Sequence, residues 1–142
     1  EEKSRLERAC GFAVAGGRQH WLRFGWKKTW SAQRGAGFLR DYTLGFNDRP
    51  GFRNGAAVWF NPVDPETGDP MDLAALPLVL MDSHVYDYAA LSSEERGQRM
   101  ADIVSEVRAV RGQACVLWHP HTLSADYGWN AGFVKLLELL RD

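Results

Sequence analysis

Residues 76–82, LPLVLMD, decide the fold class of this chain. A short, nearly continuous apolar run is typical of a strand buried on both faces, as in parallel sheets. Residues 114–118, ACVLW, form a second such run. Between them, residues 92–112 predict an amphipathic helix that begins at a capping box formed by Ser92 and Glu95. A strand, a helix and a second strand in this order predict a parallel βαβ unit.

The other predicted elements lie on both sides of this unit. The long helix carries one apolar stripe, which consists of Met100, Ile103, Val104, Val107 and Val110. A last helix over about 130–141 is expected to bury Phe133, Leu136, Leu137 and Leu140. Upstream we expect a helix over 4–10 with a capping box at Ser4 and Glu7, strands at 11–17, 38–46 and 56–60, and a helix at 29–37. The alternation predicts an α/β fold with mostly parallel strands and flanking helices, in a single domain over 1–142.

Composition excludes several classes of function. Apolar residues make up 45% of the chain and charged residues 25%, which is ordinary for a globular domain. A net charge of −1 gives no electrostatic basis for binding nucleic acid. No apolar run approaches the ~20 residues of a membrane span, and the charged opening EEKSRLERAC is unlike a signal peptide, so the expected location is the cytoplasm. Cys10 and Cys115 are expected to be buried free thiols.

Histidines gather where predicted strands end. His20, His84, His119 and His121 each follow an apolar run, and the carboxyl ends of parallel strands are where such folds place their chemistry. An imidazole there can act as a general acid or base. His119 and His121 are two apart, so they face opposite sides unless Pro120 bends the chain. A surface pair at the start of a loop is the alternative interpretation.

Three further groups qualify as candidates. Asp82 closes strand 76–82 and can orient a histidine, although it can also cap the following turn. Arg53, in the turn GFRNG, can hold a carboxylate ionised or can be a solvated surface arginine. Residues 18–30, RQHWLRFGWKKTW, interleave basic and aromatic side chains that can contact a sugar or cover one end of the fold.

Several of these segments together resemble the polysaccharide deacetylase-like family, whose fold is a distorted (β/α) barrel. The segments that carry the resemblance are GGRQHWLRF with the later TW, DYTLGFNDRPGFRNG, LPLVLMDSH, VLWHPHT and DYGWNAGFVKLL. The second of these is the most specific. The resemblance implies hydrolysis of N- or O-acetyl groups on a bacterial surface glycan, by water that a divalent metal, zinc in many members, activates.

The same resemblance assigns roles to individual residues. His119, in LWH, matches the histidine that protonates the leaving group. Arg53 is similar in placement to the arginine that orients the base, and Asp82 to the aspartate that tunes the acid histidine. Trp21, Trp26 and Arg18 are the candidate substrate-binding residues, and His20 and His84 the candidate metal ligands.

The family's opening strands, with consecutive aspartates and an H-x-x-x-H ligand pair, have no counterpart in this sequence. The chain therefore resembles the C-terminal half to two-thirds of a deacetylase barrel, and we expect it to be inactive on its own. A partial barrel has open sheet edges, which predicts a homo-oligomer or pairing with a missing piece.

Two other functions remain open. One is a non-catalytic carbohydrate- or partner-binding remnant of the fold, in which exposed aromatic side chains carry the binding. The other is a small self-sufficient hydrolase whose metal is held by His20, His84, His119 or Asp41.

Overall fold

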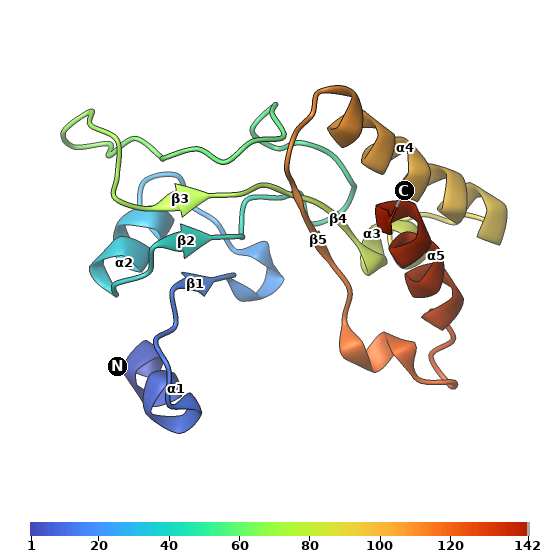
Figure 1. Cartoon of the computed structure of the whole chain (residues 1–142), viewed down its shortest axis with the longest axis horizontal. Helices are drawn as coiled ribbons and strands as arrows, with labels where there is room; N and C mark the ends of the chain where they lie inside the picture. The colour runs from blue at the N-terminus through green and yellow to red at the C-terminus, as the bar shows by residue number, and fades with distance from the viewer. Residues whose placement is uncertain (142) are drawn as a thin grey trace. The chain divides into compact units, whose positions relative to one another are not determined.

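Short parallel strands and helices follow one another in a computed structural model, which describes residues 1–141 (Figure 1). The elements, with η for a 3-10 helix, are α1 (Glu2–Cys10), β1 (Gly16–Gly17), η1 (His20–Leu22), α2 (Thr29–Gly35), β2 (Arg40–Asp41), β3 (Ala74–Ala75), β4 (Leu78–Met81), α3 (Asp82–Tyr86), α4 (Ser93–Ala109), β5 (Cys115–Leu117), η2 (Pro120–Leu123) and α5 (Asn130–Arg141). The predicted α/β class with parallel strands is confirmed, and the described residues form no closed barrel.

The chain divides into two compact units. The first contains residues 1–44 and 59–76, and the second contains residues 45–58 and the chain from Pro77 onward. The first holds the sheet β1-β2-β3 and the second holds the sheet β4-β5.

The second unit contains the predicted βαβ arrangement. β4 pairs in parallel with β5, with Leu78 opposite Cys115, and all four β4 residues are buried. α4 packs against both β4 and α5 (Figure 1). The core of the unit consists of Val79, Leu80, Val85, Met100, Ile103, Val104 and Leu136. The periodicity of the long helix therefore identified the side that faces the sheet.

Both long helices of this unit bury fewer side chains than the sequence predicted. α4 begins with the predicted capping box of Ser92 and Glu95, but Val110 follows the last helical residue and is exposed. In α5, Leu136 is buried whereas Leu137 and Leu140 are exposed. α5 contacts α4 and η2, and these contacts leave part of its apolar surface uncovered.

The sheet of the first unit is shorter than predicted. The strands expected at 11–17 and 38–46 reduce to the two-residue strands β1 and β2, and β3 was not predicted. The strand expected at 56–60 is wrong, because only Phe60 forms an isolated antiparallel bridge, to Ala75. From these runs only Leu44 and Phe60 join the core around Trp30, whereas Phe12, Val58 and Trp59 are exposed, so an apolar run here does not mark a buried strand.

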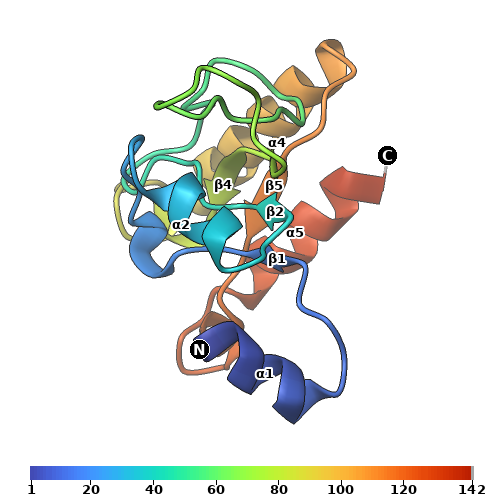
Figure 2. The ribbon, with the colours of Figure 1, turned by 90° about the vertical axis from the view of Figure 1, so that its left-hand side faces the viewer.

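α1 buries none of its residues, and it lies apart from the sheet of its own unit (Figure 2). It begins at Glu2, so the capping box predicted at Ser4 and Glu7 is wrong. The Glu7 carboxylate instead accepts hydrogen bonds from Lys3 Nζ at 2.7 Å and from the Val14 backbone N–H at 2.9 Å. Because α1 packs so little, Cys10 is exposed rather than buried, while Cys115 is partly buried.

Candidate active site

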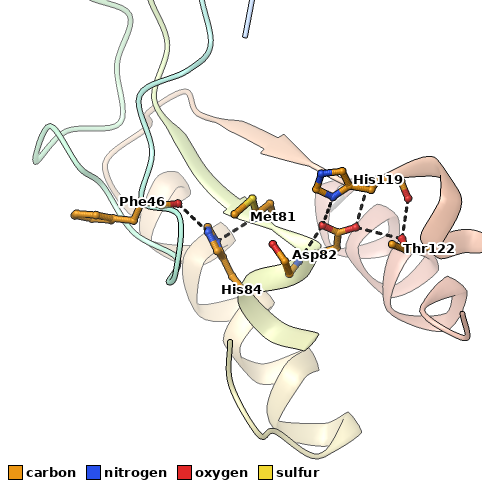
Figure 3. Close-up of polar contacts among 7 residues, drawn as sticks. Phe46, Met81, Asp82, His84, His119 and Thr122 are labelled. Atoms are coloured by element: carbon orange, nitrogen blue, oxygen red, sulfur yellow. Dashed lines mark hydrogen bonds and ion pairs between the residues drawn. The ribbon is translucent and has the colours of Figure 1, made fainter. Parts of the chain in front are cut away.

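A buried carboxylate stands at the carboxyl end of β4. Asp82 is the first residue of α3, directly after the buried strand, and its side chain is 0% exposed (Figure 3). The apolar residues of β4 carry it into the interior, and the turn into α3 places its oxygens toward the chain that follows β5. A carboxylate so placed is costly unless hydrogen bonds satisfy it.

Four donors satisfy both oxygens of Asp82. Oδ1 accepts from the backbone N–H of Ser83 at 2.9 Å and lies 2.7 Å from Nδ1 of His119. Oδ2 accepts from the backbone N–H of His119 at 2.8 Å and from the hydroxyl of Thr122 at 3.2 Å. The described donors are amides, a hydroxyl and one imidazole, so the only one that can take a positive charge is His119.

Both the ring and the backbone N–H of His119 are bonded to Asp82, while part of the ring is exposed to solvent. Its side chain is 42% exposed, and Nε2 makes no hydrogen bond within residues 1–141. With Asp82 ionised, Nδ1 donates to Oδ1, which fixes the tautomer and leaves Nε2 outward. The buried carboxylate also supplies the counter-charge for an imidazolium. Such a pair can give a proton to, or take one from, a group bound at Nε2.

The segment that follows β5 holds His119 against Asp82. Pro120 begins η2, and the one hydroxyl hydrogen of Thr122 is shared between the His119 carbonyl, at 2.7 Å, and Asp82 Oδ2, at 3.2 Å. Thr122 is 1% exposed. The sequence analysis missed this residue, although a threonine shortly after a strand-end histidine and proline is a recognisable signal for such a turn. His121 is exposed and is not among the hydrogen-bond partners of the Asp82 carboxylate.

His84 has a different environment from His119. It is buried in α3, its Nδ1 accepts the Met81 N–H at 3.1 Å, and its Nε2 lies 2.9 Å from the Phe46 carbonyl oxygen, to which it donates (Figure 3). Burial lowers the pKa of His84, although the Phe46 carbonyl acts in the opposite direction. Both ring nitrogens are engaged, so a metal could bind His84 only by displacing one of these backbone groups.

Arg53 lies in the same unit as Asp82 and His119. Its Nη1 donates to the carbonyl of Gly45 at 3.0 Å. The side chain therefore braces the segment 45–58, in which Gly45 packs tightly: a Cβ added there would stand 2.7 Å from the Leu78 carbonyl oxygen. The predicted role of Arg53 in orienting a carboxylate stays a prediction.

The other predicted site residues belong to the first unit. Nε of Arg18 donates to the Tyr42 carbonyl at 3.0 Å, and His20 is exposed at the start of η1. Trp21 is 61% exposed and Trp26 is 54% exposed. The structure thus brings together Asp82 and His119 of the predicted set, and it places Arg18, His20, Trp21 and Trp26 in a separate unit.

Asp41, also in the first unit, is the second buried carboxylate. It is 0% exposed and accepts from Trp30 Nε1 at 3.0 Å, Gln33 Nε2 at 2.7 Å, and both the backbone N–H and the hydroxyl of Thr43. Oδ1 accepts three of these hydrogen bonds and Oδ2 accepts one, all from neutral donors, and the side chain has no exposed surface.

The donor set does not fit a resident metal. Within residues 1–141, no three His, Cys, Asp or Glu side chains lie close enough together to hold a metal ion. Zinc sites in enzymes take three protein ligands. The chemistry of the site is therefore derived from the imidazole and carboxylate alone.

Comparisons with known proteins return no relative. No family model, no curated protein and no solved structure matches the chain. Over the described part of the chain, no helix is long and apolar enough to cross a membrane. The function is therefore argued from the geometry of Asp82 and His119.

Proposed function

We propose that this chain provides the acid side of a carbohydrate deacetylase site. In this proposal His119 protonates the nitrogen or oxygen that leaves when an acetyl group is hydrolysed from a glycan. The observation that carries the proposal is the 2.7 Å contact between Nδ1 of a half-exposed His119 and a fully buried Asp82. The contact holds the ring with Nε2 toward solvent, as a general acid requires.

The resemblance of LPLVLMDSH and VLWHPHT to the polysaccharide deacetylase-like family supports the same assignment. It paired Asp82 with His119 from motifs more than thirty positions apart, and these two side chains are in contact. A partial barrel of that family is the finer fold we propose for the observed parallel strands. Since residues 1–141 contain no three-ligand cluster, a metal in this function requires ligands from outside them.

The test uses the natural polypeptide that contains residues 1–142 and measures acetate release from acetylated oligosaccharides. We expect His119→Asn to reduce turnover by about 10²- to 10⁴-fold, since a general acid typically contributes that much. Tyr88→Ala is the control, because Tyr88 is 48% exposed in the same unit and is not among the hydrogen-bond partners of Asp82. Turnover by His119→Asn equal to that of the unaltered protein would contradict the proposal.

Residues 1–142 alone are expected to release no acetate. Metal-dependent release by this chain alone would instead favour the small self-sufficient hydrolase, with a metal held by His20, His84, His119 or Asp41. Zinc titration of the same chain checks this independently, since the proposal expects no stoichiometric binding.

A carbohydrate-binding protein without catalysis is the second candidate function, and the backbone at Trp21 favours it. Trp21 and Leu22 both have positive φ, at 60° and 46°, which is costly for residues other than glycine. This conformation buries Leu22 and leaves Trp21 exposed. Glycan binding lost in Trp21→Ala and Trp26→Ala but kept in His119→Ala would favour this candidate.

The short sheets also support the proposed self-association. β1 pairs with β2 on one side only, and within the first unit no described strand covers its other edge. An uncovered edge can pair with a second chain. Light scattering that shows a stable monomer at high protein concentration would contradict this proposal.

A further inference from the structure

A row of ring side chains leads away from His119 within the second unit. The ring centroids of His119 and His121 are 5.6 Å apart, those of His121 and Tyr127 5.2 Å, and those of Tyr127 and Trp129 4.8 Å. His121 belongs to η2, and Tyr127 and Trp129 belong to the segment between η2 and α5. The row therefore begins at the imidazole that we propose as the acid.

The same buried carboxylate fixes this part of the chain. The hydroxyl of Thr122 donates to Asp82, and the carbonyl of Thr122 accepts the Trp129 N–H at 3.2 Å. The carbonyl of Ser124 accepts the Tyr127 N–H at 3.2 Å. Gly128 closes the turn with φ +81°, a conformation that L residues rarely adopt. Thr122 thus fixes the position of the Tyr127 and Trp129 segment relative to His119.

The rings differ in how much surface they leave free. Trp129 is partly buried because Tyr86 stacks on it, with centroids 4.4 Å apart and planes 17° apart. Tyr127 is 45% exposed. It stands nearly perpendicular to His121, at 83°, and to Trp129, at 86°, so both neighbours contact it in edge-type geometry. Tyr127 is therefore held between two rings while 45% of its surface stays exposed.

We propose that Tyr127 is a stacking platform for a sugar ring of the glycan, next to the sugar whose acetyl group His119 serves. This assignment rests on the proposed function, since it takes the ligand to be the carbohydrate on which His119 acts. The C–H face of a pyranose is apolar and carries slight positive charge, which matches the negative face of an aromatic ring. Tyrosine has few rotatable bonds, so holding it for binding costs little conformational entropy.

His121 completes the platform. It is exposed and lies between His119 and Tyr127 in the row. Its ring nitrogens can exchange hydrogen bonds with sugar hydroxyls. The site thus requires at least two sugar units: one at His119 and one on Tyr127. A monosaccharide should bind more weakly than an oligomer of the same sugar.

The test is calorimetric titration of residues 1–142 with two soluble probes, an oligomer of N-acetylglucosamine and an O-acetylated xylo-oligosaccharide. We expect saturable binding of at least one probe, and about tenfold weaker binding by Tyr127→Ala, since an aromatic contact contributes on the order of 1.4 kcal/mol. Tyr127→Phe should bind normally because it keeps the ring. Tyr88→Ala is the matched control, since Tyr88 is 48% exposed in the same unit but outside the row.

Equal binding by Tyr127→Ala and the unaltered chain would overturn the inference, as would no binding of either probe. A second pair of measurements separates this failure from failure of the proposed function. If Tyr127→Ala weakens binding while His119→Asn releases acetate normally in the natural polypeptide, the platform stands and the deacetylase proposal fails. If His119→Asn abolishes acetate release and Tyr127→Ala binds normally, the deacetylase proposal stands and the platform is wrong.

Discussion

Asp41 and Asp82 are both fully buried at the end of a short parallel strand, one in each unit, and they have different neighbours. Asp41 is surrounded by the indole of Trp30, the amide of Gln33 and the groups of Thr43, all of them neutral. Asp82 is bonded to backbone amides, a hydroxyl and the imidazole of His119.

The comparison distinguishes Asp41, a carboxylate with a structural role, from Asp82, a carboxylate that can take part in catalysis. Asp41 has only neutral, buried donors, so its hydrogen bonds organise the surrounding core. One oxygen of Asp82 lies 2.7 Å from the ring of His119, which is 42% exposed, so the buried carboxylate is linked to a group that a ligand can reach. Burial alone therefore does not identify a functional aspartate; the partner does.

The largest loss of stability is expected from Asp41→Ala. It leaves Trp30 Nε1, Gln33 Nε2 and the Thr43 N–H without their acceptor, and each unsatisfied buried donor costs about 1–3 kcal/mol, so the total loss should exceed about 3 kcal/mol. Urea unfolding followed by tryptophan fluorescence measures it. Asp72→Ala, at an exposed aspartate of the same unit, should change the free energy of unfolding by less than about 0.5 kcal/mol. Equal losses in the two variants would contradict the structural role of Asp41.

Asp82→Asn tests the other half of the comparison. The amide cannot serve as the counter-charge of an imidazolium, so acetate release by the natural polypeptide should fall by about 10²-fold or more while the protein stays folded. Asp41→Asn, where it folds, should retain its turnover. A comparable loss in both variants would show that Asp82 contributes through folding rather than through His119.

A matched pair of threonines sharpens the comparison. The hydroxyls of Thr43 and Thr122 each donate to a buried aspartate, and both side chains are almost fully buried. Thr43→Val and Thr122→Val should each lower the free energy of unfolding by about 1–2 kcal/mol. Only Thr122→Val should also change the NMR signals of the His119 ring. If the NMR signals of the His119 ring changed in both variants, the proposed difference between Asp41 and Asp82 would be wrong.

The smallest expected effect is the pH dependence from His84. Burial lowers the pKa of His84 below its ordinary value of 6.5, so the unfolded chain takes up this proton at a higher pH than the folded one. This contribution to stability is full above about pH 6.5 and declines as the pH falls toward the lowered pKa. His84→Gln keeps an acceptor and a donor but does not titrate. Its urea midpoint should therefore fall less between about pH 7 and pH 5 than that of the unaltered chain. Parallel decreases in both proteins would contradict this assignment.

Much of the second unit could be predicted because its signals are strong and local. The run LVLM, the stripe Met100, Ile103 and Val104, and the capping box at Ser92 fixed one strand and the long helix. In the first unit, two-residue strands leave almost no periodic signal. There, apolar residues such as Trp30 and Leu44 are set by tertiary packing, which local propensity does not encode.

The site could be predicted only in part for a similar reason. Asp82 and His119 stand out as polar residues at the ends of apolar runs, and the family resemblance paired them. Thr122 and Tyr127 were not identified, because a hydroxyl or an aromatic ring in a loop has many uses. Their roles depend on contacts with Asp82 and Trp129, which the sequence does not show.

The most direct test is to measure the tautomers of His119 and His84. The two rings use their nitrogens differently, because Nδ1 donates in His119 whereas Nδ1 accepts in His84. A ¹⁵N NMR spectrum of the neutral side chains reports which ring nitrogen carries the proton. We predict that His119 carries it on Nδ1, bonded to Asp82, and that His84 carries it on Nε2, bonded to the Phe46 carbonyl. Asp82→Asn should change the His119 signals and leave those of His84 unchanged. A His119 ring protonated on Nε2 in the unaltered chain, or one that does not respond to Asp82→Asn, would contradict the account.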